Sequence, residues 1–339
     1  MLQTGLEKNT NEFFLEDAKN LSLILDEVGK VIVGQEHMTR SLLVGLLTGG
    51  HVLLEGLPGL AKTLAVKTLA QVLDTKFQRI QFTPDLLPSD LIGTMIYREE
   101  TGDFVPRKGP LFANIVLADE INRAPAKVQS ALLEAMAEKQ VTIGETTFQL
   151  EEPFLVLATQ NPIEQEGTYP LPEAQLDRFM FKLKVKYPSR EQERIILERM
   201  ASPSKPTVHV VSSAKSILQM REHVEQIYVD ERIKEYILRI VMATRPGNEL
   251  SASEVKPEAL REIQEGVQIG ASPRATIFLS KAAKAHALLE QRAYVTPDDI
   301  KAVAPEILRH RLILSFEAEA KRIDTDSLVF KLLESVTVP

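Results

Sequence analysis

The first half of the chain alternates short apolar runs with segments of helical periodicity, and this alternation restricts the fold more than any other feature. Helical spacing runs from Ala61 to Leu73 and returns from Val128 to Met136. The apolar runs predict strands at His51–Glu55, Arg79–Phe82, Ile115–Ala118, Phe154–Ala158 and Phe179–Val185. Continuous apolar strands separated by helices indicate a parallel sheet covered on both faces. The first half therefore predicts an α/β fold.

The periodicity changes near Tyr187, after which buried-strand patterns almost disappear. Helical spacing then predicts helices at Arg190–Met200, Ser213–Gln226, Glu231–Ala243, Arg274–Gln291 and Pro297–Val303. A linker rich in proline and serine, Ser202–Pro206, lies close to the change. With 339 residues the chain is long enough for two domains. We therefore expect an α/β domain over residues 1–188 and a helical domain over residues 189–339.

The composition excludes several classes of protein. The chain has 40 basic and 47 acidic residues and a formal net charge of −7, whereas proteins that coat nucleic acid usually carry a basic surplus. It has no cysteine, which excludes disulfides, thiol catalysis and thiolate metal sites. No apolar stretch approaches the ~20 residues that cross a bilayer, and Met1–Lys19 lacks the apolar run of a signal peptide. We therefore expect a soluble cytoplasmic protein with no membrane span.

One segment between the first strand and the first helix has the pattern of a phosphate-binding loop. It reads Gly56-Leu57-Pro58-Gly59-Leu60-Ala61-Lys62-Thr63-Leu64. Glycines let backbone N–H groups point at phosphate oxygens, and the new helix adds the positive end of its dipole. Lys62 supplies a charge for the β- and γ-phosphates, and Thr63 a hydroxyl for Mg²⁺. Ala61 replaces the usual last glycine, which is tolerable if its backbone is right-handed helical. Taken alone, the degenerate match also fits a glycine-proline turn before a helix.

A second segment makes the nucleotide interpretation much stronger. The apolar run Ile115–Ala118 ends in two carboxylates, Asp119 and Glu120. Asp119 would hold Mg²⁺ beside the phosphates, and Glu120 would polarise the attacking water as general base. A strand that runs into an acidic turn is common. A phosphate-loop pattern followed along the chain by such a strand is far less common. We therefore predict a site for a nucleoside triphosphate with Mg²⁺.

Three further polar residues are candidates for catalysis. Asn161 follows the strand Phe154–Ala158 and would emerge at the carboxyl edge of the sheet, where its amide could orient the lytic water. Arg178 precedes the fifth strand and could reach a γ-phosphate, either that of its own subunit or that of another. Arg274 follows Ser272-Pro273, an N-cap and N1 pair that places it in the first turn of a helix. Each also has a structural interpretation: a turn-forming Asn before Pro, or an exposed arginine.

Together these motifs resemble the AAA+ ATPases, and the MoxR branch in particular. The resemblance is carried by Gly56–Thr63, Ala118–Pro125, Ala158–Pro162 and Gly167–Phe179, and it covers about residues 20–320. Ala61 resembles the usual choice in this branch. The resemblance implies an AAA+ P-loop NTPase core with a five-stranded parallel sheet, followed by a small helical lid. It also implies ATP and Mg²⁺ as cofactors.

The resemblance assigns roles to particular residues. Val33-Gly34-Gln35 corresponds to the adenine side of the site. Asn161 resembles the first sensor, Arg274 the second sensor in the lid, and Arg178 the finger that acts on a neighbour's nucleotide; Arg123 could also reach across a subunit boundary. Two insertions resemble those that point into the pore of a ring and touch the client: Thr83–Tyr97, within an elaborated loop over residues 83–110, and the hairpin Val141–Leu150 centred on Gly144.

The function that the resemblance implies is an ATP-hydrolysing, chaperone-like motor that remodels a partner protein. MoxR-type ATPases typically act with proteins that contain a von Willebrand A domain, and a homohexameric ring is expected from the family. Two alternatives remain open: a nucleic-acid motor and the ATPase subunit of a metal chelatase. The acidic balance disfavours the first, and so do Thr83–Tyr97 and Val141–Leu150, which contain no Lys or Arg. The sequence does not exclude the second.

Overall fold

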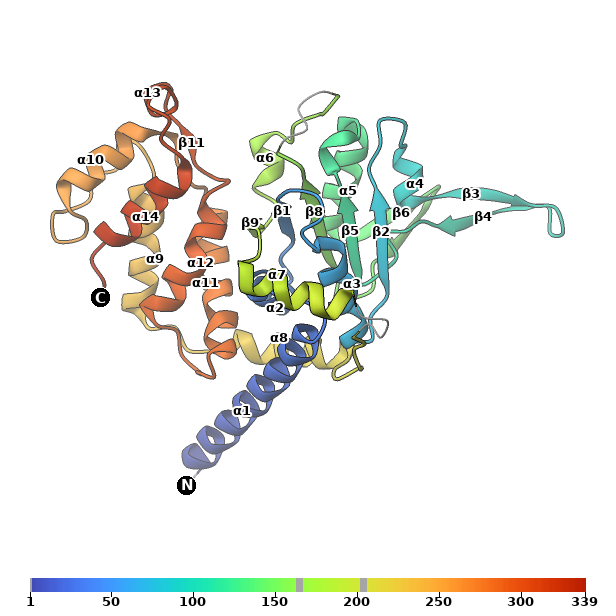
Figure 1. The fold of residues 1–339 in the computed structure, drawn as a ribbon, viewed down its shortest axis with the longest axis horizontal. Coiled ribbons are helices and arrows are strands. Elements are labelled where there is room, and N and C mark those ends of the chain that lie inside the picture. The colour runs from blue at the N-terminus through green and yellow to red at the C-terminus, as the bar shows by residue number, and fades with distance from the viewer. Residues whose placement is uncertain (1, 163–166, 202–205) are drawn as a thin grey trace. The chain divides into compact units, whose positions relative to one another are not determined.

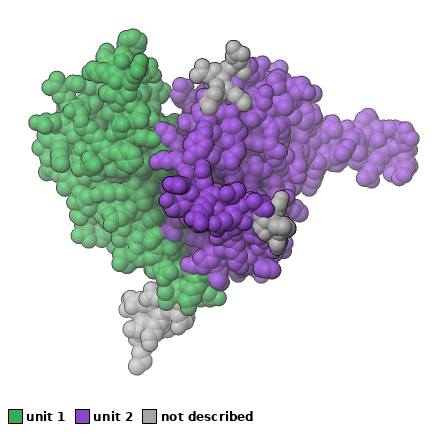
Figure 2. Space-filling model, viewed as in Figure 1, with its two compact units in different colours: residues 1–19, 220–339 green, residues 20–219 purple. Residues whose placement is uncertain are grey.

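A computed structural model describes residues 2–162, 167–201 and 206–339 of the chain. It divides into two compact units, residues 20–219 and residues 1–19 with 220–339 (Figure 2). Both divisions fall inside helices, α1 (Leu2–Gly29) and α8 (Ala214–Glu225). The unit 20–219 therefore extends beyond residue 188, where the sequence analysis places the domain boundary.

The unit 20–219 contains a five-stranded parallel sheet (Figure 1). Its strands are β1 (Val52–Glu55), β2 (Phe77–Gln81), β5 (Ile115–Asp119), β8 (Leu155–Gln160) and β9 (Phe181–Lys184). Their spatial order is β2-β5-β8-β1-β9, and every pairing is parallel. The predicted α/β fold, its sheet and all five strands are confirmed. Because β1 lies between β8 and β9, the order reverses beside β1, and ligands of open α/β sheets bind at such a reversal.

Alternate residues of the central strands pack against helices on opposite faces of the sheet. On one face, Val116 and Val156 join a core cluster with Leu132 and Met136 of α5 (Ala126–Glu138). On the other face lie α2 (Glu36–Thr48) and α3 (Lys62–Val72). A Cβ added to Gly45 of α2 would meet the side chain of Val52 at 3.2 Å, so α2 packs closely on the sheet. Burial on both faces explains why these strands are apolar throughout.

Two antiparallel hairpins interrupt the α/β pattern. After the short helix α4 (Pro88–Ile92), β3 (Gly93–Arg98) pairs with β4 (Asp103–Lys108) and projects away from the sheet as a ribbon (Figure 1). The loop expected over residues 83–110 is therefore wrong, because this segment contains a paired ribbon whose mostly exposed side chains impose no apolar period of two. The second hairpin, β6 (Gln140–Ile143) with β7 (Thr146–Gln149), confirms the hairpin expected within Val141–Leu150.

Helix α7 (Arg190–Met200) belongs to the unit 20–219 because it packs against the loop that follows α1. A Cβ on Gly34 would meet the Gln192 side chain at 2.7 Å, and Gly34 also has a positive φ of 76°. Arg199 donates from Nη1 to the carbonyl oxygens of Gly29 and Lys30 at 2.9 and 2.8 Å. Residues 202–205 of the expected linker lie outside the described residues.

The other unit is mainly helical, as expected. It contains α9 (Glu231–Ala243), α10 (Pro257–Gly266), α11 (Pro273–Leu289), α12 (Pro297–Leu308), α13 (Phe316–Ala320) and α14 (Thr325–Ser335). A short antiparallel pair, β10 (Val267–Ile269) with β11 (Ile313–Leu314), is also present. Helix α12 continues through Pro305, beyond the predicted end at Val303, because Ile307 and Leu308 of its last turn are buried. No helix in the described ranges combines the length and apolar character needed to span a membrane.

Candidate functional site

The phosphate-loop segment lies where the strand order reverses. It leaves the carboxyl end of β1 after Glu55 and enters α3 at Lys62, so the first N–H groups of α3 face the loop. A Cβ on Gly56 would meet Cβ of Val185 at 2.9 Å, so this position accepts only glycine without a shift of the neighbouring chain. The Lys62 Nζ donates to the Gly56 carbonyl oxygen at 2.6 Å and folds back over the loop. The local geometry is that of an anion cradle.

Two adjoining pockets lie along this loop. A polar pocket of about 410 Å³ is lined by Pro58, Gly59, Ala61, Lys62, Thr63, Leu64, Arg79, Asp119, Glu120, Thr159 and Asn161. A more apolar pocket of about 220 Å³ is lined by Val31, Ile32, Val33, Gln35, Gly59, Leu60, Ala61, Leu64, Pro188, Ile196 and Met200. The pockets share Gly59, Ala61 and Leu64. A polar pocket beside an apolar one suits a ligand with a charged end and a flat apolar end, as a nucleotide has.

Alanine at position 61 was expected to be tolerated because of a right-handed helical backbone, but Ala61 does not have one. It is the N-cap residue of α3 with φ 57° and ψ 19°, in the left-handed region. A non-glycine residue there costs about 1–2 kcal/mol because its Cβ crowds the following carbonyl oxygen. The expectation is therefore corrected: the alanine is accommodated with strain, at a position that lines both pockets.

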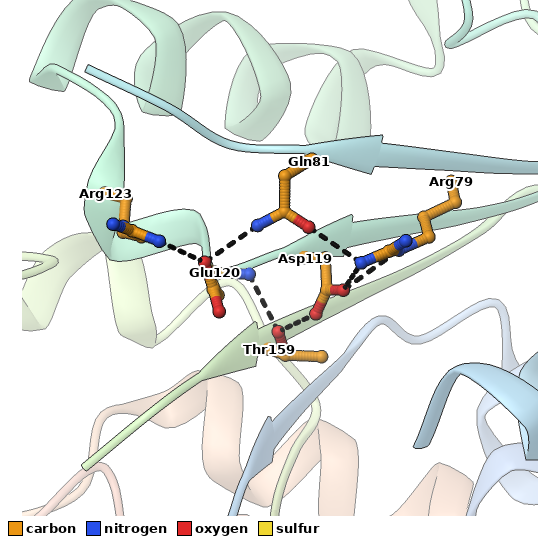
Figure 3. A network of polar contacts seen from close by, with 6 residues as sticks. All are labelled: Arg79, Gln81, Asp119, Glu120, Arg123 and Thr159. Carbon is orange, nitrogen blue, oxygen red and sulfur yellow. Dashed lines mark hydrogen bonds and ion pairs between the residues drawn. The ribbon is translucent and has the colours of Figure 1, made fainter. Parts of the chain in front are cut away.

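The carboxylate of Asp119 is held by two neighbouring strands (Figure 3). Its Oδ2 accepts from Nη2 and Nε of Arg79 on β2, at 2.7 and 3.0 Å. Its Oδ1 accepts from the Thr159 hydroxyl on β8 at 2.6 Å. Asp119 ends β5, which lies between β2 and β8, so the strand order brings the three residues together. Both oxygens of Asp119 thus have a donor within the chain.

Glu120 follows directly, and the Gln81 side chain reaches it from β2 (Figure 3). Its Oε2 accepts from Gln81 Nε2 at 2.7 Å and from Arg123 Nη1 at 2.9 Å. Its backbone has φ 57°, and its N–H donates to the Thr159 hydroxyl at 2.8 Å. A left-handed non-glycine residue at a strand end is a form of local strain that clusters at active sites. Gln81 also accepts from Arg79 at 2.8 Å, so Asp119 and Glu120 belong to one hydrogen-bonded chain.

Burial lowers the pKa of Lys62, while Asp119 and Glu120 act in the opposite direction. The ammonium therefore lacks part of its hydration before any ligand arrives. An anion in the polar pocket would restore favourable interactions to this charge, which is the electrostatic requirement of a phosphate site.

The donor set fits Mg²⁺. Thr63 and Asp119 both line the polar pocket, and their hydroxyl and carboxylate oxygens are hard ligands of the kind that Mg²⁺ prefers. Among the residues that the structure describes there is no cluster of three or more His, Cys, Asp or Glu side chains. Mg²⁺ is commonly bound by one or two protein oxygens together with substrate phosphates. The pocket therefore suits a metal that arrives with a phosphate ligand.

The structure gathers most of the predicted site residues into these pockets. Lys62, Thr63, Asp119, Glu120 and Asn161 share the polar pocket, which Pro58, Gly59, Ala61 and Leu64 also line. Val33 and Gln35 line the apolar pocket with Leu60, and Gln35 Nε2 donates to the Lys186 carbonyl oxygen at 3.2 Å. Gly34 packs against α7, and Gly56 and Leu57 lie in the loop outside the described lining of both pockets.

The two predicted arginines lie elsewhere. Arg178 donates from Nη1 to the Leu133 carbonyl oxygen at 3.3 Å and is not part of the described lining of the polar pocket. Arg274 lies in the first turn of α11, where its N–H donates to the N-cap Ser272 hydroxyl at 3.2 Å. The expected N-cap and N1 geometry is confirmed. The roles of both arginines remain predictions.

Sequence reasoning missed three residues of the site: Arg79, Gln81 and Thr159. Arg79 and Gln81 alternate with buried Ile80 on β2, so both project from one side of that strand. The alternation of polar Arg79 and Gln81 with apolar Ile80 was the signal that could have identified these two residues. Thr159 is buried at the end of β8 and has no signal of its own, because its partners come from a strand remote in sequence.

Comparisons with known proteins agree with this geometry. Residues 51–181 match the family model described as "ATPase family associated with various cellular activities (AAA)", and residues 260–331 match the AAA lid domain. The chain is 48% identical to Chaperone MoxR1 of Mycobacterium tuberculosis over 95% of its own length and 83% of that protein's. It is 30% identical to Protein MoxR of Methylorubrum extorquens, with 92% and 93% covered.

A solved structure extends the agreement to the fold. A candidate ATPase from Cytophaga hutchinsonii superposes with a TM-score of 0.89 and 48% identity, and the match covers 100% of both chains. The five-stranded sheet, the loop before α3 and the carboxylate pair at the end of β5 thus occur in a chain that is 48% identical to a protein named Chaperone MoxR1. The chain belongs to the MoxR-type family of AAA+ ATPases.

Proposed function

We propose that the protein hydrolyses ATP at the polar pocket, with Mg²⁺ as cofactor. The observation that carries the proposal is that Lys62, Thr63, Asp119, Glu120 and Asn161 line a single cavity beside an apolar one. Lys62 pairs with the β- and γ-phosphates, while Thr63 and Asp119 hold the metal. Mg²⁺, when bound, supplies positive charge to the phosphate oxygens.

Glu120 accepts the proton of the attacking water, and Asn161 orients that water. Gln81 and Arg123 both donate to Oε2 of Glu120, so the proton can be accepted at Oε1 while these contacts persist. The adenine ring lies against the apolar pocket beside Val33-Gly34-Gln35, where Ile196 and Met200 of α7 form a wall. Burial of an apolar face there contributes affinity without a charged partner.

We further propose that ATP turnover drives remodelling of a partner protein. The ribbon β3–β4 supports a polypeptide client. Its register places Tyr97 opposite Phe104 and Met95 opposite Pro106 on one face, and the first pair has ring centroids 5.3 Å apart. Both aromatic side chains are more than half exposed. An apolar face of this kind fits an apolar segment of a polypeptide.

The charges of the ribbon are balanced. The ribbon extends past Tyr97, where the expected insertion ends, and adds Arg98, Arg107 and Lys108, so the insertion as a whole is not free of basic residues. The same stretch adds Glu99, Glu100 and Asp103. Three basic against three acidic side chains give no surplus of positive charge for a phosphate backbone, and such a surplus supplies most non-specific nucleic-acid affinity. The charge argument for a protein client therefore holds for the longer ribbon.

The working assembly that we propose is a homohexameric ring in the cytoplasm, with a core over residues 1–188 and a lid over residues 189–339. Arg178, which is not part of the described lining of its own polar pocket, acts as finger on the nucleotide of a neighbouring subunit. Arg274 couples the lid to the nucleotide, and Arg123 lies at the subunit boundary. The partner that we propose is a protein with a von Willebrand A domain, and the relative named as a chaperone supports a role in protein maturation.

ATP turnover in the presence of candidate clients tests this function. Phosphate release is measured with a co-encoded von Willebrand A protein, single-stranded DNA, duplex DNA and RNA, at low and physiological salt, with Lys62→Ala as the inactive control. We expect stimulation by the protein alone. Stimulation by nucleic acid that persists at physiological salt, with none from the protein, would replace this function with that of a nucleic-acid motor.

Mixing of variants tests the ring. Arg178→Ala should bind ATP normally and turn over about 10³–10⁵-fold more slowly, the range for loss of an arginine finger. Mixing it with Lys62→Ala should restore some activity, because each variant supplies what the other lacks. No rescue in mixtures that are confirmed to co-assemble would mean that Arg178 acts within its own subunit or not at all.

A further inference from the structure

The Arg79–Asp119 pair places a positive charge at the carboxylate that the metal requires (Figure 3). Both guanidinium nitrogens of the contact, Nη2 and Nε, donate to the same oxygen, Oδ2. The other oxygen is taken by the Thr159 hydroxyl at 2.6 Å. A metal ion that coordinates Asp119 through Oδ2 must therefore replace Arg79 or share an oxygen with it.

We propose that Arg79 is a positioning residue that competes with divalent cations for Asp119, so that the metal binds firmly only together with a nucleotide. The inference rests on the proposed function, because it concerns the metal of the same site. Arg79 and a divalent cation carry charge of the same sign, and both seek the same carboxylate oxygen. At distances of a few ångströms their repulsion outweighs thermal energy. In the absence of metal, Arg79 thus neutralises the charge of the Asp119 carboxylate.

The exchange is feasible because Arg79 is not locked in place. Its side chain is 49% exposed, against 14% for Asp119. Exposed ion pairs are weak, since solvent screens them and the long side chain retains alternative conformations. The two hydrogen bonds share one oxygen and do not form the stronger two-oxygen fork. Displacement of Arg79 therefore costs little.

A displaced Arg79 still has a partner. Its Nη2 donates to Gln81 Oε1 at 2.8 Å, so the guanidinium stays beside the site when the bond to Asp119 breaks. Arg79 also lines the polar pocket itself, where phosphate oxygens are further acceptors. A nucleotide thus helps the exchange twice, because it supplies oxygen ligands to the metal and a new anionic partner to Arg79. A metal ion alone supplies neither.

Binding of Mn²⁺ in the absence of nucleotide tests the proposal without any measurement of activity. The free ion is followed by electron paramagnetic resonance for the wild type, Arg79→Gln, Arg79→Lys and a control. Arg79→Gln should bind Mn²⁺ about tenfold more tightly, because one unit charge is removed from within a few ångströms of the ion. Arg79→Lys should fall between this variant and the wild type, because it keeps the charge but loses the planar donor group.

The matched control is Lys76→Gln, which removes one positive charge from the residue before β2. Lys76 pairs with Glu151 at 3.1 Å and is 69% exposed, and it does not line the polar pocket. Its Mn²⁺ affinity should equal that of the wild type. The double variant Arg79→Gln with Asp119→Asn should lose the gain, which shows that the added affinity resides at Asp119. Thermal unfolding of each protein verifies that it is folded.

Two results would overturn the proposal. One is an Arg79→Gln affinity for Mn²⁺ equal to or weaker than that of the wild type, since an arginine that merely supports the site cannot tighten metal binding when it is removed. The other is a gain that persists without Asp119. Because no nucleotide is present, either result is separate from a failure of the proposed ATP hydrolysis, which the Lys62→Ala and client assays address.

Discussion

Two aspartates in different units of the protein have the same kinds of partner and different surroundings. Asp119 contacts Arg79 and Thr159 in the unit 20–219. Asp299, at the start of α12 in the other unit, contacts Arg292 and Thr296 and also His286. Each carboxylate thus combines an arginine with a threonine hydroxyl. The residue types alone do not separate the two sites.

The difference lies in exposure and in the geometry of the arginine contact. Asp299 is fully buried, and Arg292 reaches both of its oxygens, with Nη1 to Oδ2 at 2.7 Å and Nη2 to Oδ1 at 2.6 Å. The carboxylate also accepts from the Thr296 backbone N–H at 2.7 Å and so caps α12. Asp119 is partly exposed, and Arg79 reaches one oxygen only. Asp119 also lines the polar pocket, whereas Asp299 is fully buried.

The same residue types thus form a fixed structural contact where they are buried and an exchangeable cation site where they are accessible. Burial alone would raise the pKa of Asp299, but hydrogen bonds from His286, Arg292 and Thr296 hold that pKa well below its ordinary value. The charge of Asp299 is thus compensated by hydrogen bonds from neighbouring side chains. The charge of Asp119 can be transferred from an arginine to another cation.

Asp119→Asn should give the largest effect on activity. ATP turnover should fall about a thousandfold, because the charge stabilisation supplied through a metal ligand is worth several kcal/mol. The free energy of unfolding should change by less than about 1 kcal/mol, as expected for a partly exposed ion pair. Phosphate release and urea unfolding of the same preparation measure both. A loss of about 3 kcal/mol, as expected for a buried ion pair, would mean that Asp119 is a structural residue like Asp299.

Asp299→Asn should give the opposite result. Removing one partner of a buried ion pair leaves Arg292 uncompensated and costs about 3 kcal/mol of unfolding free energy. Under conditions in which the variant remains folded, its affinity for ATP should match that of the wild type. Urea unfolding and equilibrium nucleotide binding test the two halves of this prediction. Wild-type stability in this variant would show that the buried cluster contributes nothing that an amide cannot replace.

The contribution of Asp299 to stability should depend on pH. The pKa of Asp299 in the folded protein lies below its ordinary value of 3.8, so its contribution to stability is complete above that pH and is lost as the pH falls towards the folded value. The difference in unfolding free energy between the wild type and Asp299→Asn should therefore shrink as the pH falls below about 4. A difference that stays constant from pH 6 to pH 3 would mean that the carboxylate charge plays no part.

Ala61→Gly should have the smallest effect. Glycine relieves the left-handed strain of about 1–2 kcal/mol, but it also increases the entropy of the unfolded chain by about 0.5–1 kcal/mol. The net gain in stability should stay below about 1.5 kcal/mol, and ATP affinity should be unchanged. Thermal unfolding and nucleotide titration measure both. A clear loss of stability would show that the Ala61 methyl group contributes more by packing than it costs in strain.

The fold was predictable where the spacing of apolar residues in the sequence matches the buried face of the element. The three central strands β1, β5 and β8 are apolar and buried almost throughout. The helical face of Glu231–Ala243 is equally plain, and its predicted bounds coincide with those of α9. The ribbon β3–β4 was not predictable, because most of its side chains are exposed and no buried face imposes a period of two. Helix α14 was also missed, although Leu328, Leu332 and Val329 are buried at helical spacing.

The site residues were predictable where they lie next to one another in the sequence and form a recognisable motif. The loop through Thr63 and the pair Asp119-Glu120 each form one local motif. Arg79 and Gln81 acquire their roles only from the strand order, which places β2 beside β5. The left-handed backbone of Ala61 could not be read from the sequence either, because alanine is normally taken to favour right-handed conformations.

The claim that the polar pocket is a site of ATP hydrolysis depends most directly on Glu120. ATP binding and phosphate release should be measured together for Glu120→Gln and the wild type at saturating Mg²⁺. The amide keeps the shape of the side chain but cannot accept a proton, so ATP should bind with wild-type affinity while turnover falls about 10²–10⁴-fold. Turnover at the wild-type rate would contradict the account, because Glu120 would then not be the base and the pocket would have to act in another way.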